Sequence, residues 1–556
     1  MPLNEAETRA ALAALGAEGV SAVAICFLHS YANPANEQAA ARLAAEALPE
    51  AYVVASHDIL PVWREYDRFS TTVVSAYVGP VVDQYLATLD RRLREIGFGG
   101  TLLLVQSDGL VLTPEESRRR AVYLISSGPA AAPSAATYWG RAADATNLIS
   151  VDMGGTSFDV SLIRAGEIPT TTETWVGEER VAIKMVDVHS VGAGGGSIAW
   201  TDALGLLRVG PRSAGADPGP ACYGRGGAEP TVTDADLVLG YVPDDYFLGG
   251  AITLQPDRAR DALARLGERL GLDAVQTAHA VFTTVNSFMA DQIMEVSTKR
   301  GHDVRDFTLI GAGGAGAVHA ASIARLVGIP TILIPRFSAL FSAFGMFAMP
   351  IGRSYVRSYL RRLAAVELDT VNRLFAEMEA EGRQAFAPLR VPAEAVALRR
   401  TVDLRYIGQF HEIEVPVARY PLSVEDLAQA EADFHRRHQE LYGFTQPRRG
   451  LELLGCRTTA TVASAPVDIP SAATRDADPT PALWRHRPCF FDGRFVETPC
   501  YLGERLAAGN VLDGPAIVEE TTTTVVVPDG FTCTVDPYRN YLLRQGDLPA
   551  HSPGGA

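Results

Sequence analysis

Two glycine-rich turns, each placed directly after a short apolar run, constrain the fold more than any other feature of the sequence. The first apolar run, 148–153, ends at Gly154 and Gly155, and a second apolar run follows over 158–163. The other turn, 311–316, lies between an apolar run and a stretch with helical periodicity. Glycine lets the backbone turn tightly and approach other groups closely, so we predict that both turns close the ends of buried strands.

Strand and helix patterns alternate as far as residue 334, which is typical of an α/β protein. After residue 352 apolar and polar residues alternate, so we expect a mostly β C-terminal region with helical insertions. We expect Asn36 to cap the second helix. The predicted helices cover 4–17, 36–48, 77–96, 257–270, 274–299, 317–327 and 367–386. The predicted strands cover 20–28, 53–56, 102–106, 148–153, 158–163, 307–310, 331–334, 397–406, 412–417, 453–462, 490–497, 516–518, 522–527 and 532–535.

Composition excludes several classes of protein. Hydrophobic residues make up 47% and charged residues 21%, as in an ordinary globular protein. The net charge, 49 − 65 = −16, argues against nucleic acid as a partner, because phosphate backbones attract basic surfaces. Six scattered cysteines without a CxxC pair and an acidic N-terminus without an apolar core predict a reduced, cytoplasmic protein. The uncharged run 307–324 holds four glycines, so we expect no membrane span.

The segment from Asp152 to Asp159 (Asp-Met-Gly-Gly-Thr-Ser-Phe-Asp) has the chemistry of a phosphate loop. Its glycines allow close approach of an anion, and the backbone amides and hydroxyls of Thr156 and Ser157 are donors for it. A carboxylate such as Asp152 beside bound phosphate suits a Mg²⁺ ion between the two, often through water. The alternative is a tight β-hairpin whose glycines only turn the chain.

The second turn, 311–316, fits the pattern GxGxxG. A dinucleotide site of that kind also needs an acidic residue about 20 positions further on, and the next one here is Glu367. NAD is therefore disfavoured, whereas a glycine-lined slot for an adenosine moiety fits. The alternative is close packing of a strand against a helix. No GxxxxGK[ST], HExxH or GxSxG pattern occurs, so a P-loop, a zincin and a serine hydrolase are excluded.

A third glycine-rich region covers 192–197 and 210–224. Such a loop is costly to order, so we expect an interface or a second ligand loop. Asp187, His189, Asp217 and Cys222 could form a metal set, but their spacing is irregular and a structural explanation is favoured.

With these motifs in view, the chain resembles the hydantoinase A/5-oxoprolinase family, which includes N-methylhydantoinase A and the ATP-binding subunits of acetone and acetophenone carboxylases. The matching stretches follow the family's order over nearly the whole chain. They are 64–68, 70–74, 76–80, 127–131, 152–160, 192–198, 213–226, 231–234, 300–303, 313–316, 405–409 and 514–520.

The resemblance implies a fold of the actin/hexokinase/Hsp70 (ribonuclease H-like) type, in which two α/β lobes clamp ATP and Mg²⁺ before a β-rich C-terminal domain. It assigns Asp152 to Mg²⁺ and Asp159 to a second polar role near the phosphates, and both are candidate catalytic residues. The implied phosphate-binding residues are Gly154, Gly155, Thr156 and Ser157, and the implied adenosine-binding residues are Gly313, Gly314 and Gly316.

The chain also departs from the family pattern. Members begin with another DxGGT loop in the first lobe, which this chain lacks, so we expect an incomplete first lobe. Phe158 replaces a small hydroxyl residue. The expected division is 1–70 as the remainder of the N-terminal domain, 71–352 as the ATPase-type domain, 353–545 as the β-rich domain and 546–556 as a disordered tail.

The function implied by the resemblance is ATP-dependent hydrolysis of a small cyclic amide, such as a hydantoin or 5-oxoproline. The expected partner is a subunit of the hydantoinase B type, in a homo- or hetero-oligomer. ATP-dependent carboxylation of a ketone is an alternative that the sequence does not separate. A non-catalytic family member without the first phosphate loop is the third possibility.

Overall fold

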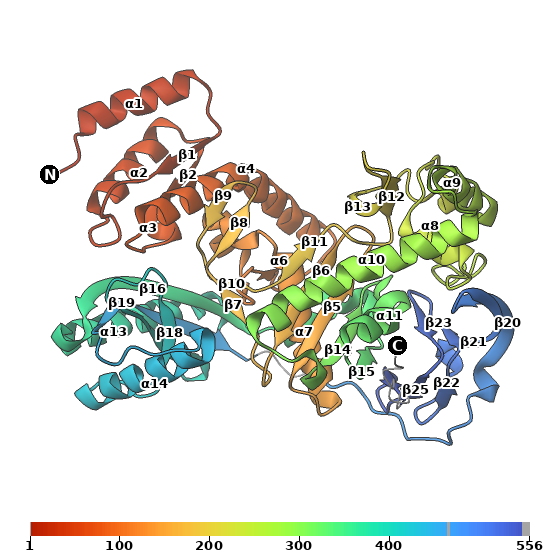
Figure 1. Ribbon diagram of the computed structural model, residues 1–556. Helices are drawn as coiled ribbons and strands as arrows, with labels where there is room; N and C mark the ends of the chain where they lie inside the picture. Colours follow the sequence, from red (N-terminus) through yellow and green to blue (C-terminus); the bar gives the residue numbers. More distant parts are fainter. Residues whose placement is uncertain (1, 464–466, 547–556) are drawn as a thin grey trace. The chain divides into compact units, whose positions relative to one another are not determined.

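The computed structural model describes residues 2–463 and 467–546. The chain forms two compact units, and each unit interleaves three segments of the sequence (Figure 1). Unit 1 comprises Met1–Ser127, Thr170–Val186 and Met349–Ala465, and unit 2 comprises Gly128–Pro169, Asp187–Ala348 and Pro466–Ala556. The strand-rich stretch after residue 352 therefore contributes to both units. The division of the sequence at residues 70 and 352 remains a prediction.

Unit 1 begins with a small α/β layer. Strands β1 and β2 are parallel, and α1 and α2 bury Leu12 and Leu43 with them. The second helix starts one residue earlier than expected, after Pro34, so Asn36 is not its cap; the Asn33 side chain instead accepts a hydrogen bond from the Ala35 amide (3.1 Å). The bounds are α1 Glu5–Ala17, β1 Ala22–Ile25, α2 Ala35–Ala47, β2 Tyr52–Ala55 and α3 Ser56–Ile59.

Helix α4 (Glu65–Glu95) begins twelve residues before the predicted start at residue 77. The added turns contain Thr71, Thr72 and Val74, whose β-branched side chains lower helix propensity. All three are buried, so packing within unit 1 overrides the local preference. Pro80 lies inside the helix without ending it.

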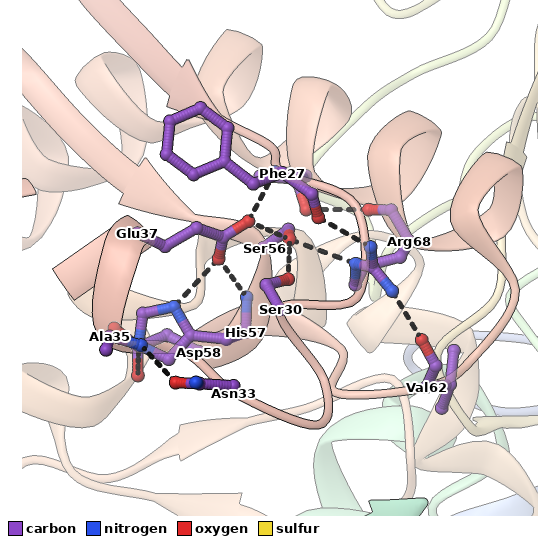
Figure 2. Close-up of polar contacts among 11 residues, drawn as sticks. Phe27, Ser30, Asn33, Ala35, Glu37, Ser56, His57, Asp58, Val62 and Arg68 are labelled. Carbon is purple, nitrogen blue, oxygen red and sulfur yellow. Dashed lines mark hydrogen bonds and ion pairs between the residues drawn. The ribbon is translucent and has the colours of Figure 1, made fainter. Parts of the chain in front are cut away.

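A buried carboxylate ties this layer together (Figure 2). Glu37 accepts hydrogen bonds from the Phe27 amide (2.7 Å), the Ser56 hydroxyl (2.7 Å) and the His57 amide (2.9 Å), and pairs with His57 Nδ1 (2.8 Å). The Arg68 guanidinium donates to Ser56 Oγ (3.0 Å) and to the Phe27 carbonyl (2.9 Å). Burial raises the pKa of Glu37, but these hydrogen bonds outweigh it and lower that pKa to about 2. The network therefore holds Glu37 ionised.

The remainder of unit 1 is built on a six-stranded sheet of order β18-β17-β19-β16-β4-β3. Helices α13 and α14 pack on one face of it, where Phe375 and Phe434 join Val402, Leu404 and Tyr406 in one buried cluster. The side chains between these strand residues face away from the helices because strand side chains alternate. The other bounds in unit 1 are β3 Leu104–Val105, β4 Val111–Leu112, α5 Pro114–Arg119, β7 Thr170–Thr171, β8 Thr174–Val176, β9 Glu179–Val181, β10 Met185–Val186, β16 Ile351–Arg362, α13 Leu368–Ala385, β17 Ala397–Tyr406, β18 Ile413–Val417, α14 Val424–Tyr442 and β19 Leu451–Val462.

Unit 2 is an α/β unit around an eight-stranded mixed sheet of order β11-β6-β5-β14-β15-β26-β25-β22. The central strands β5, β14 and β15 are parallel. Alternate residues face opposite layers: Ile149 and Leu309 pack with α8 to α11, and Leu148 and Ile310 pack with α7 and α12. The α/β prediction is confirmed. The bounds are α6 Ser127–Ala130, which spans the change of unit, then α7 Ala132–Ala142, β5 Leu148–Met153, β6 Phe158–Ile163, β11 His189–Val191, β12 Ser197–Thr201, β13 Leu207–Ser213, α8 Val232–Val238, α9 Pro256–Leu270, α10 Ala274–Val296, β14 Thr308–Ala312, α11 Gly316–Val327, β15 Thr331–Ile334 and α12 Phe341–Ala348.

The last part of unit 2 adds a four-stranded sheet, β20-β21-β23-β24. One strand predicted over 490–497 is wrong: the chain turns at Asp492 and Gly493, which have φ of 49° and 83°. Asp-Gly with both φ positive is the pattern of a two-residue hairpin turn, so the segment forms two strands. The bounds are β20 Leu483–Phe491, β21 Arg494–Leu502, β22 Val511–Asp513, β23 Ala516–Glu519, β24 Thr524–Val527, β25 Phe531–Val535 and β26 Tyr541–Gln545.

Within the described residues, no helix combines the length and the apolar character that crossing a bilayer requires. All six cysteines are free thiols, and five of them are buried. The tail predicted to be disordered, 546–556, lies outside the described residues except for Gly546.

Candidate functional site

The two glycine turns lie side by side in unit 2, at the carboxyl ends of neighbouring parallel strands. Strand β5 pairs with β14 (Figure 1). In this pairing Asp152 lies opposite Ala312. The turns also touch, because the Ala315 amide donates to the Met153 carbonyl (3.1 Å). Ligands of open α/β sheets bind at this edge, beyond the carboxyl ends of the strands. The structure thus brings the two predicted motifs together at one place.

The first turn joins β5 to β6 as an antiparallel hairpin in which Asp152 is level with Asp159. The Gly154 amide donates to the Ser157 carbonyl (3.1 Å) and closes the turn. Packing does not require glycine here, since a Cβ added at Gly154 or Gly155 meets nothing within 4 Å, and neither residue has a positive φ. The open space in front of both residues is compatible with an anion approaching the backbone. Phe158, at the end of the turn, is fully buried.

Part of the third glycine region supports the first turn from behind. The Gly195 amide donates to the Gly154 carbonyl (3.0 Å), and the Gly196 amide donates to the Gly155 carbonyl (2.7 Å). A Cβ at Gly194 would lie 2.6 Å from Gly155 C, so only glycine fits there. Thr233, at the start of α8, donates its hydroxyl to the Gly195 carbonyl (2.8 Å). Gly194 to Gly196 therefore pack against the first turn and support its backbone.

The second turn is fixed mainly by packing. Gly313 has a φ of +87°, and a Cβ there would lie 2.1 Å from the Met153 carbonyl oxygen. Its amide donates to the Ser338 carbonyl (2.8 Å). Gly314 is exposed, with no atom closer than 3.7 Å to an added Cβ, and Gly316 is the buried first residue of α11. Strand–helix packing therefore explains Gly313, whereas Gly314 has room for a ligand.

The two carboxylates of the first turn have raised pKa values. Burial, together with the negative charge of Asp159, outweighs a hydrogen bond from Ser342 (3.0 Å) and raises the pKa of Asp152 to about 6. Burial also raises the pKa of Asp159, against a hydrogen bond from Ser190. A cation held between two such carboxylates would restore their charged form, so the donor set fits a hard divalent ion such as Mg²⁺. Sequence reasoning missed Ser190 and Ser342, which lie in no recognisable motif.

The alternative metal set is wrong. Asp187 and His189 lie together, but they bind Arg300, whose Nη1 is 2.6 Å from Asp187 Oδ2. Cys222 is buried elsewhere, and its amide donates to Asp234 (2.7 Å). In the part of the chain that the structure describes, no three His, Cys, Asp or Glu side chains are grouped to hold a metal.

Sequence profiles of known families decide what kind of protein carries this arrangement. The profile described as Hydantoinase/oxoprolinase matches residues 68–351, and profiles of the N-terminal region and the C-terminal domain of the same family match 1–48 and 361–546. The chain belongs to the hydantoinase/oxoprolinase family. The predicted family is therefore confirmed.

Relatives within the family cover almost all of the chain. Caprolactamase subunit alpha of Pseudomonas jessenii is 37% identical over 553 residues, which are 98% of this chain and 79% of that protein. The gamma subunit of acetophenone carboxylase from Aromatoleum aromaticum is 31% identical over 98% of this chain and 77% of its own length. The crystal structure of the ATP-dependent caprolactamase from Pseudomonas jessenii superposes with a TM-score of 0.86 at 37% identity, covering 98% of this chain and 80% of that one.

Proposed function

We propose that this hydantoinase/oxoprolinase family member is the ATP-binding subunit of an enzyme that hydrolyses a small cyclic amide of the hydantoin or 5-oxoproline type. The observation that carries the proposal is the meeting of the two glycine turns at the carboxyl ends of β5 and β14. The similarity to caprolactamase subunit alpha supports cyclic amides as the substrate class. An actin-type fold belongs to the same proposal.

In this proposal the first turn holds the phosphates. The Gly155 amide and the donors of Thr156 and Ser157 would bind phosphate oxygens, and Gly154, whose amide closes the turn, would let the anion approach the backbone. Asp152 would hold Mg²⁺ with Asp159 close by. Gly314 lines the adenosine side, and Gly313 and Gly316 place that turn against β5 and α11. The contacts of Gly194 to Gly196 keep the first turn in one conformation, and this preorganises its amides.

ATP, when bound, would supply a phosphoryl group that turns the amide oxygen into a better leaving group. The residues of this chain would bind and orient the triphosphate, since phosphoryl transfer depends mainly on positioning and charge stabilisation. Asp152 has to be ionised to hold a cation, and burial makes its pKa about 6 without one. Mg²⁺ affinity should therefore increase as the pH rises through about 6 and then level off.

The test uses the full chain together with its hydantoinase B-type partner subunit, ATP, Mg²⁺ and a panel of hydantoins and lactams. Phosphate release and the ring-opened product are measured together. We expect both to depend on one cyclic amide and to occur in equal amounts. If no cyclic amide raises phosphate release above the background, the proposed hydrolysis is wrong. A chain that binds ATP but supports no turnover with any substrate is the non-catalytic alternative.

ATP-dependent carboxylation of a ketone is the second candidate, favoured by the match to the acetophenone carboxylase gamma subunit. The same assay separates the two functions. Phosphate release that requires both a ketone and bicarbonate, and that yields a carboxylated product, supports carboxylation. Release that is independent of bicarbonate and gives a ring-opened amino acid supports hydrolysis.

A further inference from the structure

A small charged cavity lies within unit 1, on residues that the glycine-turn site does not use. Its volume is about 30 Å³. Its walls come from segments far apart in the sequence: the start of α4, the strands β7 to β9, and the sheet strands β16 to β19 with their loops. The charged side chains that line it are Arg64, Asp67, Arg180, Asp403, Glu412 and Arg457.

The three guanidinium groups each face a carboxylate. Arg64 Nη2 lies 2.6 Å from Glu412 Oε2, and Arg457 Nε lies 2.8 Å from Asp403 Oδ2. Arg180 Nε lies 3.2 Å from Asp67 Oδ1. The side chains of these residues are between 7% and 24% exposed, so the charges are largely removed from solvent. Burying six charges is costly unless their hydrogen bonds are complete.

Those hydrogen bonds are not complete. Arg64 Nε is buried and has no hydrogen-bond partner among the described residues. Arg180 Nε is buried too, and although Asp67 Oδ1 lies 3.2 Å away, the two atoms do not form a hydrogen bond of regular geometry. A buried N–H group without an acceptor costs about 1–3 kcal/mol. Arg64 therefore presents a donor without an acceptor beside the cavity, and Arg180 one that is poorly satisfied, which points to an acceptor that occupies the cavity.

Aromatic rings hold two of the arginine planes in place. The Arg64 guanidinium lies 5.3 Å from the ring centre of Trp63 and 4.4 Å from that of Phe410. The guanidinium of Arg405, which does not line the cavity, lies 5.1 Å from the centre of the same Trp63 ring. Because stacking fixes the orientation of the guanidinium fork, the donors are preorganised before a ligand arrives.

The volume of the cavity and the geometry of its arginine donors together indicate which class of ligand it binds. A volume of about 30 Å³ corresponds to about two water-sized spheres. This fits a planar group of three or four heavy atoms and excludes a nucleobase or a whole sugar. Planar guanidinium forks match planar oxyanions with two oxygens in one plane. We propose that the cavity of unit 1 binds the planar oxyanion of a carboxylate or of bicarbonate.

The proposal goes beyond the ATP-dependent reaction and does not rest on it. Binding to this cavity needs no nucleotide, metal or partner subunit, so it can hold even if the proposed function is wrong. The oxyanion could be a free ion or the carboxylate end of a ring-opened amide. Both sources share the chemistry that the arginines recognise, and the experiment separates them.

Asp403 gives the site a pH dependence. Burial raises its pKa to about 6, Arg457 lowers it, and the charges of Glu414 and Glu412 raise it. Glu414 itself is ionised and paired with Lys184 (2.7 Å). Protonation of Asp403 removes a negative charge that repels the ligand and competes for Arg457. An oxyanion should therefore bind more tightly below pH 6 than at pH 7.5.

The experiment is calorimetric titration of the full chain with sodium formate, which stays ionised at pH 5.5, against sodium chloride at equal ionic strength. We expect one formate per chain and binding about tenfold tighter at pH 5.5 than at pH 7.5. Bicarbonate at pH 7.5 and 6-aminohexanoate are the other two probes. If formate or bicarbonate binds and 6-aminohexanoate does not compete, the natural ligand is a free ion. If 6-aminohexanoate displaces formate, the natural ligand is the carboxylate of the ring-opened product. Either result supports the cavity as an oxyanion site.

Two variants and one control make the result specific. Arg180→Lys keeps the charge and removes the planar fork, so formate should bind at least about tenfold more weakly. Asp403→Asn should tighten formate binding at pH 7.5 and abolish its pH dependence, an effect that loss of folding cannot imitate. Arg91→Lys, on the exposed face of α4, is the matched control and should change nothing. If neither formate nor bicarbonate binds saturably, or if both cavity variants bind the ion as the unmodified chain does, the cavity holds only water and the proposal is wrong.

Discussion

The glycine-turn site of unit 2 and the charged cavity of unit 1 are built in opposite ways. At the glycine turns the groups proposed to face a ligand belong mainly to the backbone of two short segments, 152–157 and 311–316. In the cavity they are side chains, and Arg64 and Arg457 are separated by 393 positions. A backbone site tolerates few substitutions at its glycines, whereas a side-chain site depends on charge balance and on the pairs around it. The two regions should therefore respond differently to substitution and to pH.

The largest effect should come from Asp152→Asn, which removes the carboxylate that the proposal assigns to the cation. We expect substrate-dependent phosphate release to fall by about 10²–10³-fold, as when one electrostatic group of an active site is lost. The measurement is phosphate release with the partner subunit and saturating ATP and Mg²⁺. Glu268→Gln, exposed on α9, is the control and should leave the rate unchanged.

The same variant should also change how the free energy of unfolding depends on pH. The pKa of Asp152 is about 6 in the folded chain and 3.8 as its reference value. The fold therefore binds this proton more tightly than the unfolded chain, and stability is lost as the pH rises from about 4 to about 6. Asp152→Asn should then be more stable at pH 8 by about 1–3 kcal/mol in urea unfolding. Equal stability at pH 8 would contradict the burial of a charged Asp152.

Gly313→Ala should mainly affect folding. The new Cβ would lie 2.1 Å from a backbone oxygen of β5 at a φ of +87°, so neither partner can move cheaply. We expect the free energy of unfolding to fall by about 2–4 kcal/mol, of which about 1–2 comes from the left-handed conformation. Gly314→Ala, with no atom nearer than 3.7 Å, is the matched control and should stay within about 0.5 kcal/mol. If Gly314→Ala also leaves ATP affinity unchanged, the second turn serves only to pack β14 against its neighbours and does not contact adenosine.

The site built from short backbone segments is easier to predict from the sequence than the cavity built from distant side chains. Strands 148–153, 158–163 and 397–406 are predicted to the residue, because apolar runs beside a glycine turn and, in 397–406, alternating apolar and polar residues are local signals. The α/β class follows from such signals, and the family follows from the resemblance of motifs along the chain. The pairing of β5 with β14, which brings the two turns together, comes from the structure. The incomplete first lobe and the roles of the individual site residues stay predictions.

What the sequence does not reveal depends on contacts between distant segments. The first turns of α4 include Thr71, Thr72 and Val74, which are poor helix formers and are buried within unit 1. The charged cavity combines Arg64, Arg180 and Arg457, which no spacing rule connects. Likewise, the need for glycine at Gly194 comes from the turn at Gly155 rather than from its own neighbours.

Glu37→Gln tests the side-chain-built part of unit 1. The amide has one acceptor oxygen instead of two, and its NH₂ would face the donors that Glu37 now satisfies, such as the amides of Phe27 and His57. We expect the unfolding free energy at pH 7 to fall by about 2–3 kcal/mol. The pKa of Glu37 is lowered to about 2 from 4.5, so its contribution is complete above pH 4.5 and is lost as the pH falls toward 2.

The difference between the unmodified chain and Glu37→Gln should therefore shrink in urea titrations carried out at decreasing pH. Glu46→Gln, at an exposed pair with Arg9, is the control and should change stability by less than about 0.5 kcal/mol at any pH. A difference that stays constant from pH 7 to pH 3 would mean that the charge of Glu37 is not what stabilises this layer.

The smallest change, Gly155→Ala, gives the sharpest test of the backbone-built site. The added methyl group meets no protein atom within 4 Å and requires no positive φ, so stability should change by less than about 0.5 kcal/mol. It would project into the open space in front of the turn, so ATP affinity measured by calorimetry should fall about tenfold. Gly194→Ala should lower both quantities, because its Cβ would lie 2.6 Å from Gly155 C. Unchanged ATP affinity in Gly155→Ala would mean that the first turn is only a hairpin, and the contrast between a backbone site in unit 2 and a side-chain site in unit 1 would then fail.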